Sequence, residues 1–202
     1  MADTGTVDHM RSVLARRPGV ASSDFDLNAD QGGLSSAARL RPAAVLVGLL
    51  PVGGDWHVVL TKRTAALVHH PGQVAFPGGK QEPGEDPVAA ALREAEEEIG
   101  LSPAQVTVIG SADPHQTITG FDVTPIVATI APGFTARPDP SEVAEVFTVP
   151  LTFLLDPTHT RIEGRTWKGA YRRYYTMPYG PYYIWGATAR ILVALQSLWG
   201  RR

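Results

Sequence analysis

The chain contains no cysteine, which excludes disulfide bonds, thiol catalysis and thiolate metal sites. No apolar run has the length that a membrane-spanning helix needs, and residues 1–20 lack the apolar stretch of a signal peptide. An excess of basic residues is also missing: 18 Lys and Arg oppose 20 Asp and Glu. Because nucleic acids and anionic membranes select basic surfaces, neither is expected as the main partner. We therefore expect a soluble, cytoplasmic protein.

The composition is that of a folded domain, with 44% hydrophobic and 19% charged residues among 202. This length favours one domain with terminal extensions over two domains. Residues 1–38 are expected to form a loosely attached N-terminal extension, rich in Ser, Asp and Gly, with one short helix near 8–17. Residues 39–202 then form the domain and end in a helix.

Hydrophobic patterning and turn residues predict the elements of that domain. Strands are expected at 43–50, 56–61, 106–109, 123–130, 143–149, 171–177 and 182–185, with a short extended piece at 73–76. Helices are expected at 87–99 and 187–199, with a helical turn at 151–155. Strands and helices do not alternate strictly, so the fold class is α/β, with a mixed sheet in a sandwich.

The clearest helix spans residues 87–99, with Asp86 as N-cap, Pro87 in the first turn and Gly100 as the left-handed stop. On a helical wheel its expected core face contains Val88, Leu92, Ala95 and Ile99, within an arc of about 60°. Glu94, Glu97 and Glu98 occupy another arc, about 140° away.

The three glutamates repel one another and lie near the negative end of the helix dipole. An acidic helix face exposed to solvent is one interpretation. The other is a functional site, because a local rule broken without compensation is typical of one. Hard divalent cations would supply the compensation, since Mg²⁺ prefers oxygen ligands and is commonly completed by substrate phosphates.

The flanking residues decide between these interpretations. A set of residues lies at fixed spacings: Gly79, Glu85, Arg93, Glu94, Glu97, Glu98, Gly100 and Leu101. The small apolar residue Ala95 directly follows Glu94. This pattern resembles the signature of the Nudix hydrolases in full. The resemblance implies a Nudix-type α/β/α sandwich with a mixed central sheet and hydrolysis of a nucleoside diphosphate linked to another group.

The resemblance also implies roles for these residues. Glu94 and Glu98 would bind Mg²⁺ or Mn²⁺, and Glu97 would bind it directly or through water and is the first candidate for the general base. Gly78 and Gly79 would form a tight loop whose backbone approaches the metal or a phosphate. Glu85 and Arg93 are expected to form a structural ion pair.

A second set of motifs resembles the coenzyme A pyrophosphatase branch of the family. These motifs are residues 59–64, 72–79, 117–121, 124–125, 142–146 and 184–189, and they lie within residues 42–192. The resemblance implies coenzyme A as substrate, with 4′-phosphopantetheine and adenosine 3′,5′-bisphosphate as products. Arg63 is expected to contact a substrate phosphate. Val68 departs from the branch pattern, which has arginine there, and His69 or His70 could take over part of that role.

Several alternatives stay open. Arg63 could be a surface residue, His69 and His70 could pack or cap a loop, and Glu142 and Glu145, further candidates for the base or a metal ligand, could be strand-edge charges. The aromatic segment 167–185 could stack an adenine, fill a hairpin core or form a homodimer contact. The rival functions are hydrolysis of ADP-ribose, a dinucleotide or a nucleoside triphosphate, and nucleotide binding without catalysis.

Overall fold

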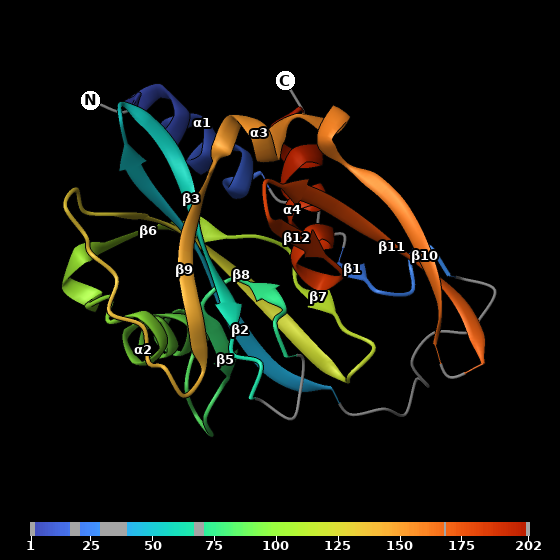
Figure 1. Cartoon of the computed structure of the whole chain (residues 1–202). Coiled ribbons are helices and arrows are strands. Elements are labelled where there is room, and N and C mark those ends of the chain that lie inside the picture. Colours follow the sequence, from blue (N-terminus) through green and yellow to red (C-terminus); the bar gives the residue numbers. More distant parts are fainter. Residues whose placement is uncertain (1–2, 17–20, 29–39, 67–70, 168, 201–202) are drawn as a thin grey trace.

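The computed structural model describes residues 3–16, 21–28, 40–66, 71–167 and 169–200 (Figure 1). In this part of the chain the strands form a nine-stranded sheet and a separate three-stranded sheet. None of its helices has the length and apolar character required to cross a membrane.

The large sheet is mixed, as expected from the sequence. Its main path runs β1 (Ser22–Ser23), β7 (His115–Gln116), β8 (Phe121–Ile130), β2 (Arg41–Val52), β3 (Asp55–Arg63) and β4 (Val74–Ala75). Three further strands join it: β5 (Gly78–Lys80) pairs with β2, β6 (Val106–Ser111) with β8, and β9 (Val143–Pro150) with β3. The β2–β8 and β1–β7 pairs are parallel and the remaining pairs are antiparallel. The predicted β2–β3 hairpin is confirmed, with Val52 opposite Asp55.

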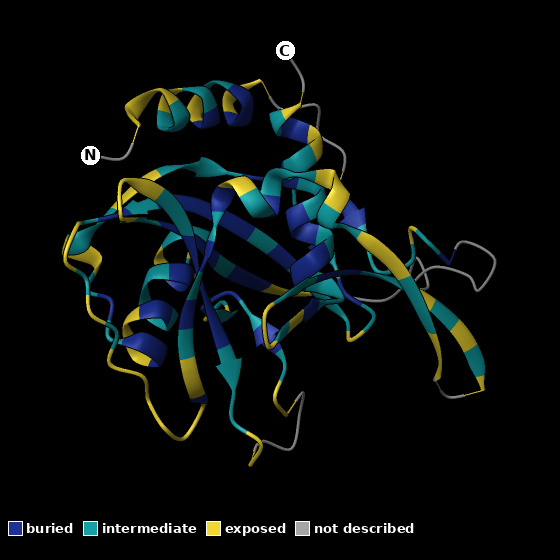
Figure 2. Cartoon of the chain, turned by 45° about the horizontal axis from the view of Figure 1, so that its top comes forward, coloured by how far each residue is buried: buried dark blue, intermediate teal, exposed yellow. Residues whose placement is uncertain are grey.

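Helices cover both faces of this sheet (Figure 1). Helix α2 (Pro87–Ile99) packs on one face and shares a core cluster with residues of β2, β3 and β8. Helices α1 (Thr4–Ala15), α3 (Leu151–Leu155) and α4 (Ala187–Trp199) contribute to the core on the other face. The central strands are accordingly the most buried elements (Figure 2). The predicted α/β/α sandwich is confirmed.

Helix α2 has the predicted bounds because its capping signals are local. The Asp86 carboxylate accepts hydrogen bonds from the backbone N–H groups of Val88 and Ala89 at 2.8 and 3.0 Å. Gly100 adopts the left-handed conformation, with φ of 68°, and its N–H donates to backbone carbonyl groups in the last turn of the helix. Two single 3₁₀ turns, η2 (Pro103–Gln105) and η3 (Pro157–His159), follow later in the chain.

The N-terminal segment is more firmly attached than the sequence suggested. Helix α1 begins at Thr4 rather than near Asp8, because Asp3 caps it through the N–H of Gly5. Its buried Met10, Val13 and Leu14 belong to the main core cluster. The expectation of loose attachment is therefore wrong for residues 3–16, and β1 places residues 22–23 in the sheet. The domain boundary at 38/39 falls outside the described residues and stays a prediction.

The three-stranded sheet contains one strand that the sequence analysis missed. Its order is β10 (Arg161–Trp167), β11 (Ala170–Tyr179) and β12 (Tyr182–Trp185), all antiparallel. The sequence predicted β12 and most of β11, but not β10. The β10–β11 ribbon extends away from the large sheet (Figures 1 and 2).

Candidate active site

Glu98 lies buried where the C-terminal half of α2 packs against β5. Only 5% of the residue is exposed. Its Oε2 accepts a hydrogen bond of 3.2 Å from the N–H of Gly78, and its Oε1 lies 3.9 Å from Nη1 of Arg63. Burial raises the pKa of Glu98 to about 7, with a smaller contribution from the negative charge of Glu94. The positive charge of Arg63 acts in the opposite direction but does not cancel the effect of burial.

The buried face of α2 differs from the helical-wheel prediction. Ala90, Ala91, Ala95 and Ile99 are fully buried, and Glu98 lies among them. Val88 and Leu92 are only partly buried at the edge of the cluster. The prediction placed Glu98 outside the core face because the helical wheel took Val88 and Leu92 as the centre of that face. The small alanines let α2 approach the sheet closely, and the face that binds the core also carries Glu98.

Glu94 lies one turn before Glu98 and its side chain is 19% exposed. Burial raises its pKa, and the charges of Glu97 and Glu142 act in the same direction. Arg93 opposes this shift through a hydrogen bond of 3.0 Å from Nη1 to Oε1 of Glu94. The structure therefore brings Glu94 and Glu98 together as two carboxylates whose ionised forms are disfavoured.

Arg93 ties the segment before α2 to the helix. Its Nε lies 2.9 Å from Oε1 of Glu85, and its Nη2 lies 3.1 Å from the other oxygen of the same carboxylate. Nη2 also donates to the carbonyl of Lys80, and Nη1 lies 3.2 Å from the exposed Glu97. These contacts raise the pKa of Arg93 and lower that of Glu85. The expected Glu85–Arg93 pair is thus present, and it is bidentate.

Gly78 and Gly79 form strand β5 rather than the expected loop. At Gly78, with φ of 151°, a Cβ atom would overlap the backbone of Ala44 and Val45 on β2. At Gly79, a Cβ would overlap the carboxylate of Glu94. Because Gly78 and Gly79 have no side chains, β5 can lie between β2 and the acidic side chains of α2.

Of the two additional acidic candidates, only Glu142 lies electrostatically close to the α2 pair. Its charge contributes to the raised pKa of both Glu94 and Glu98. Glu145 instead accepts a hydrogen bond from the Tyr182 hydroxyl, whose ring stacks on Phe147. Phe147 belongs to the core on the opposite face of the sheet from α2. The structure thus separates Glu145 from the α2 carboxylates.

The carboxylates of this site fit a hard divalent cation in donor type and charge. Within the described residues no three acidic or histidine side chains already converge on one point. However, Glu94 and Glu98 are both buried enough to have raised pKa values, and all of their donors are oxygens. A bound cation would offset their mutual repulsion, and oxygen ligands are those that Mg²⁺ and Mn²⁺ accept. Glu94, Glu98 and the more exposed Glu97 could hold it.

Arg63 ends β3 beside these carboxylates, where the sequence analysis expected a phosphate contact. The other expected contact, His70, lies outside the described residues, as do His69 and Val68. Gln73 connects this region to a neighbouring cavity: its carbonyl accepts a hydrogen bond of 2.9 Å from the N–H of Arg63, and its side chain lines the cavity.

That cavity has a volume of about 390 Å³ and draws its walls from distant segments of the chain. Asp24 and Asn28 contribute from the N-terminal segment, Thr117–Thr119 from the loop after β7, and Gly186 and Ala187 from the start of α4. The remaining wall is basic and aromatic, with Arg165, Arg172, Arg173, Tyr174 and Trp185. Sequence reasoning identified the aromatic segment but missed the arginines. Arg165 lies on β10, which was not predicted, and no local signal placed Arg172 and Arg173 of β11 at a cavity.

The N-terminal wall of this cavity is fixed by a buried chain of hydrogen bonds. His115 is fully buried and lies 3.1 Å from Asp24 through Nε2 and 3.0 Å from Ser22 through Nδ1. The other oxygen of Asp24 accepts from the N–H of Ile118 at 2.9 Å. Ser22 is buried as well, so these hydrogen bonds hold Asp24 in position in the cavity wall.

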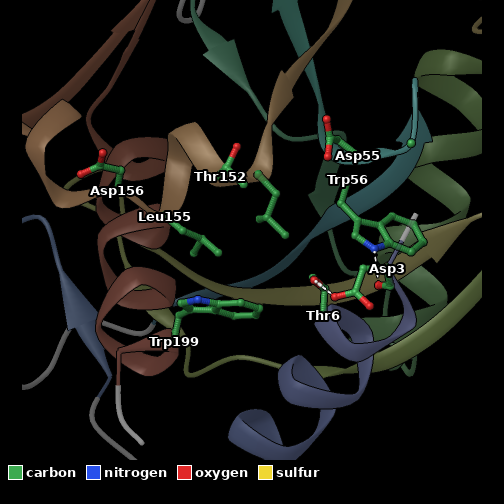
Figure 3. Close-up of a pocket in the computed structure, with 10 residues that line it drawn as sticks. Asp3, Thr6, Asp55, Trp56, Thr152, Leu155, Asp156 and Trp199 are labelled. Atoms are coloured by element: carbon green, nitrogen blue, oxygen red, sulfur yellow. Dashed lines mark hydrogen bonds between the residues drawn. The ribbon is translucent and has the colours of Figure 1, made fainter. Parts of the chain in front are cut away.

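A second cavity, of about 320 Å³, lies between α1, the β2–β3 turn, α3 and the end of α4 (Figure 3). Trp56, Trp199 and Leu155 line it, together with Asp3 and Asp156. Both carboxylates cap helical turns. Asp3 accepts a hydrogen bond from the backbone N–H of Gly5, and Asp156 accepts one from the backbone N–H of Thr158. The turn that borders the cavity is at the opposite end of β3 from Arg63, so this cavity is separate from the carboxylate site.

Comparisons with known proteins agree with this arrangement. Residues 39–167 match the model of the NUDIX domain. The chain is 41% identical over 166 residues to a Cronobacter sakazakii protein named "Uncharacterized Nudix hydrolase NudL", covering 80% of this chain and 85% of that protein. A protein of the same name from Escherichia coli K12 is 40% identical over 161 residues, covering 77% and 82%.

A solved structure with a similar sequence is the Nudix hydrolase RenU of M. smegmatis, at 32% identity and a TM-score of 0.48, covering 55% of this chain and 71% of that one. The domain match spans more than half of the chain and contains Gly79, Glu85, Arg93 and the glutamates of α2. On this evidence, the chain belongs to the Nudix hydrolase family.

Proposed function

We propose that this Nudix hydrolase cleaves the diphosphate of coenzyme A or its derivatives, giving 4′-phosphopantetheine and adenosine 3′,5′-bisphosphate. Hydrolysis of a diphosphate-containing substrate follows from the family, whereas coenzyme A is the specific proposal. Its main support is the 390 Å³ cavity. Gln73, the 117–119 loop and the 185–187 segment come from three separate motifs of the coenzyme A branch, and all three line that cavity.

The side chains of the α2 site have distinct proposed roles. Glu94 and Glu98, with Glu97, would hold Mg²⁺ or Mn²⁺, which supplies charge neutralisation of the diphosphate and a water of lowered pKa. Arg63, beside Glu98, would bind a substrate phosphate as a charged hydrogen-bond donor. Arg93 has its donors engaged with Glu85, Glu94, Glu97 and Lys80, so it positions the carboxylates.

The general base is proposed among the acidic groups that reach this site. Glu97 is more exposed than Glu94 and Glu98, with 60% of its side chain accessible, so its carboxylate, although bonded to Arg93, can also contact a water on the substrate side. Glu142 is the alternative, since its charge acts on Glu94 and Glu98. Glu145 is not proposed for this role, because its carboxylate accepts a hydrogen bond from Tyr182 on the face of the sheet away from α2.

The test compares coenzyme A, ADP-ribose, NADH and dGTP at matched concentration with Mg²⁺. We expect the highest kcat/KM for coenzyme A, and mass spectrometry in ¹⁸O-labelled water should identify the two phosphorylated products and the attacked phosphorus. Preferential cleavage of ADP-ribose or NADH would assign the enzyme to another nucleoside diphosphate derivative. Nucleotide binding without hydrolysis in the presence of Mg²⁺ or Mn²⁺ would contradict the enzymatic assignment.

A further inference from the structure

The three-stranded sheet has an open edge at β10. Among the described strands, β10 pairs with β11 alone, and the ribbon of these two strands extends away from the large sheet (Figures 1 and 2). The strand contains no proline, and its register with β11 is continuous from Arg161 to Trp167. Proteins usually cover or interrupt such an edge, because its N–H and C=O groups pair readily with another strand. The edge of β10 is therefore suited to strand addition.

The hydrogen bonds of β11 show which backbone groups of β10 point to this edge. The N–H of Arg173 donates to Oδ1 of Asn28 at 2.8 Å, and its C=O accepts from Nδ2 of the same side chain at 2.9 Å. Both groups therefore point away from β10. Gly164 lies opposite Arg173, so its own N–H and C=O point away from β11, toward the open edge. By the same alternation, those of Ile162 and Thr166 point to this edge as well.

Opposite charges are placed symmetrically about Gly164, the central residue of β10. Glu163 and Arg165 flank it, and their side chains share one face of the strand. A second β10, paired antiparallel with Gly164 opposite Gly164, would overlap along the full strand and place each Glu163 opposite the Arg165 of the other copy. A register centred on Glu163 or on Arg165 would instead place like charges opposite each other, which is destabilising. The register with the longest overlap is thus also the one with matched charges.

The two charged groups can take part in such a pairing. Neither belongs to an ion pair with another described residue. Glu163 accepts hydrogen bonds of 2.7 Å from the Tyr183 hydroxyl and 3.5 Å from the Thr176 hydroxyl, and its carboxylate has further lone pairs. The guanidinium of the exposed Arg165 lies 4.6 Å from the ring centroid of Trp185, a stacking contact that uses none of its N–H donors.

Exposed apolar side chains occupy the other face of the ribbon. Ile162 is 53% exposed and Tyr171 is 61% exposed. The Tyr171 ring covers Gly164, where a Cβ atom would overlap it. In the register centred on Gly164, Ile162 lies opposite Thr166 of the second copy, and the Tyr171 rings of both copies approach the two-fold axis. The same pairing would therefore bury apolar surface on one face and match charges on the other.

We propose that β10 is a homodimer interface, in which the β10 strands of two chains pair antiparallel about a two-fold axis at Gly164. The two small sheets then form one continuous sheet, through the same surface on both copies. The partner is a second copy of this chain because the charge pattern of the strand is complementary to itself. The inference is independent of the proposed function, since the pairing requires neither metal nor substrate.

Sedimentation velocity on the full chain tests this interface. One strand pair with a small apolar patch is a small interface, so we expect dimers at about 100 µM protein and monomers at about 1 µM. Glu163→Arg and Arg165→Glu should each raise the dimer Kd at least about tenfold, because each places like charges opposite each other. An equimolar mixture of the two variants restores opposite charges at both positions and should dimerise again. Glu96→Arg, the same reversal at an exposed position on α2, should match the wild type.

Amide hydrogen exchange provides a second measurement that requires no variant. The amides of Gly164 and Thr166 should exchange more slowly at the higher protein concentration, because pairing occupies them. The amide of Arg173, which bonds Asn28, should exchange at the same rate at both concentrations. A chain that stays monomeric at the higher concentration would overturn the interface. A dimer that persists in both charge variants, a mixture that stays monomeric, or exchange at Gly164 that is independent of concentration would overturn it as well.

Discussion

At the scale of single residues, Glu98 shows how one carboxylate can belong to both the core and the active site. It lies among the fully buried alanines of α2, where it accepts a hydrogen bond from the N–H of Gly78 and has the guanidinium of Arg63 at 3.9 Å. Burial of a charge without close compensation costs stability. The cost is understandable if the carboxylate has the second task proposed above, which is to hold a divalent cation.

The first prediction concerns this residue and its neighbour Glu94. Glu98→Gln and Glu94→Gln should each lower kcat/KM at least about a hundredfold, because even groups that only support a metal ligand contribute ten- to a hundredfold. The melting temperature without metal should not fall, since glutamine keeps the shape and removes a buried charge. Activity assays with calorimetry measure both quantities. The control is Glu96→Gln, an exposed position on the same helix, and normal turnover in Glu98→Gln would refute the proposed site.

The two glycines of β5 should respond differently to alanine. Gly79→Ala places a methyl group against the flexible Glu94 side chain, so the protein should fold and lose activity at least about tenfold. Gly78→Ala places it against the backbone of β2, where overpacking and strain cost about 2–3 kcal/mol. The melting temperature of Gly78→Ala should then fall by roughly 5 °C or more. If one of the two variants showed both the larger loss of activity and the larger fall in melting temperature, this division between activity and stability would be contradicted.

At the scale of elements, α2 was predictable because its start, end and charge pattern are written in neighbouring residues. Asp86, Pro87 and Gly100 fix its bounds without any distant contact. Its buried face was not predictable in the same way, because burial of Glu98 depends on β5 and β2. β10 escaped prediction because its sequence, RIEGRTW, contains a central glycine and three charged residues, and is a strand only through its pairing with β11.

Removal of the α2 cap tests how far helix stability and catalysis are independent. Asp86→Ala leaves two backbone N–H groups of the first turn without their acceptor and should cost about 1 kcal/mol. Thermal unfolding should show a decrease of roughly 2–4 °C in melting temperature. The kcat should stay near the wild-type value, because the glutamates lie at the other end of the helix. Glu96→Ala is the matched control, and a large loss of kcat in Asp86→Ala alone would show that the cap positions the site.

At the scale of the whole molecule, the sheet divides the chemistry from much of the stability. The α2 carboxylates lie on one face, whereas α1, α3 and α4 complete the larger core on the other. The sequence predicted this layered architecture through its family resemblance. It could not predict the cavity, because residues as distant as Asp24 and Trp185 meet there only through the folded topology.

Truncation of Leu14 on α1 should therefore affect stability alone. Leu14 is buried in the main cluster, and Leu14→Ala should cost about 2–4 kcal/mol. Differential scanning calorimetry should show a melting temperature lower by roughly 5–10 °C. At a temperature where the variant is folded, its KM and kcat should equal those of the wild type. Asp8→Ala, on the exposed side of the same helix, should change neither the melting temperature nor the kinetic constants. An altered KM in Leu14→Ala would show that α1 influences the site.

The assembly of the cavity has a consequence for how such an enzyme can diversify. The carboxylates proposed for hydrolysis are encoded in one continuous stretch, whereas the neighbouring chamber is lined by Asp24 and Asn28 upstream and by residues 172–174 and 185–187 downstream. If the chamber binds the substrate as proposed, exchange of these outlying segments would redirect the enzyme toward a different substrate while the α2 carboxylates stay intact. Selectivity and reactivity can thus be inherited, lost or engineered separately within a single polypeptide.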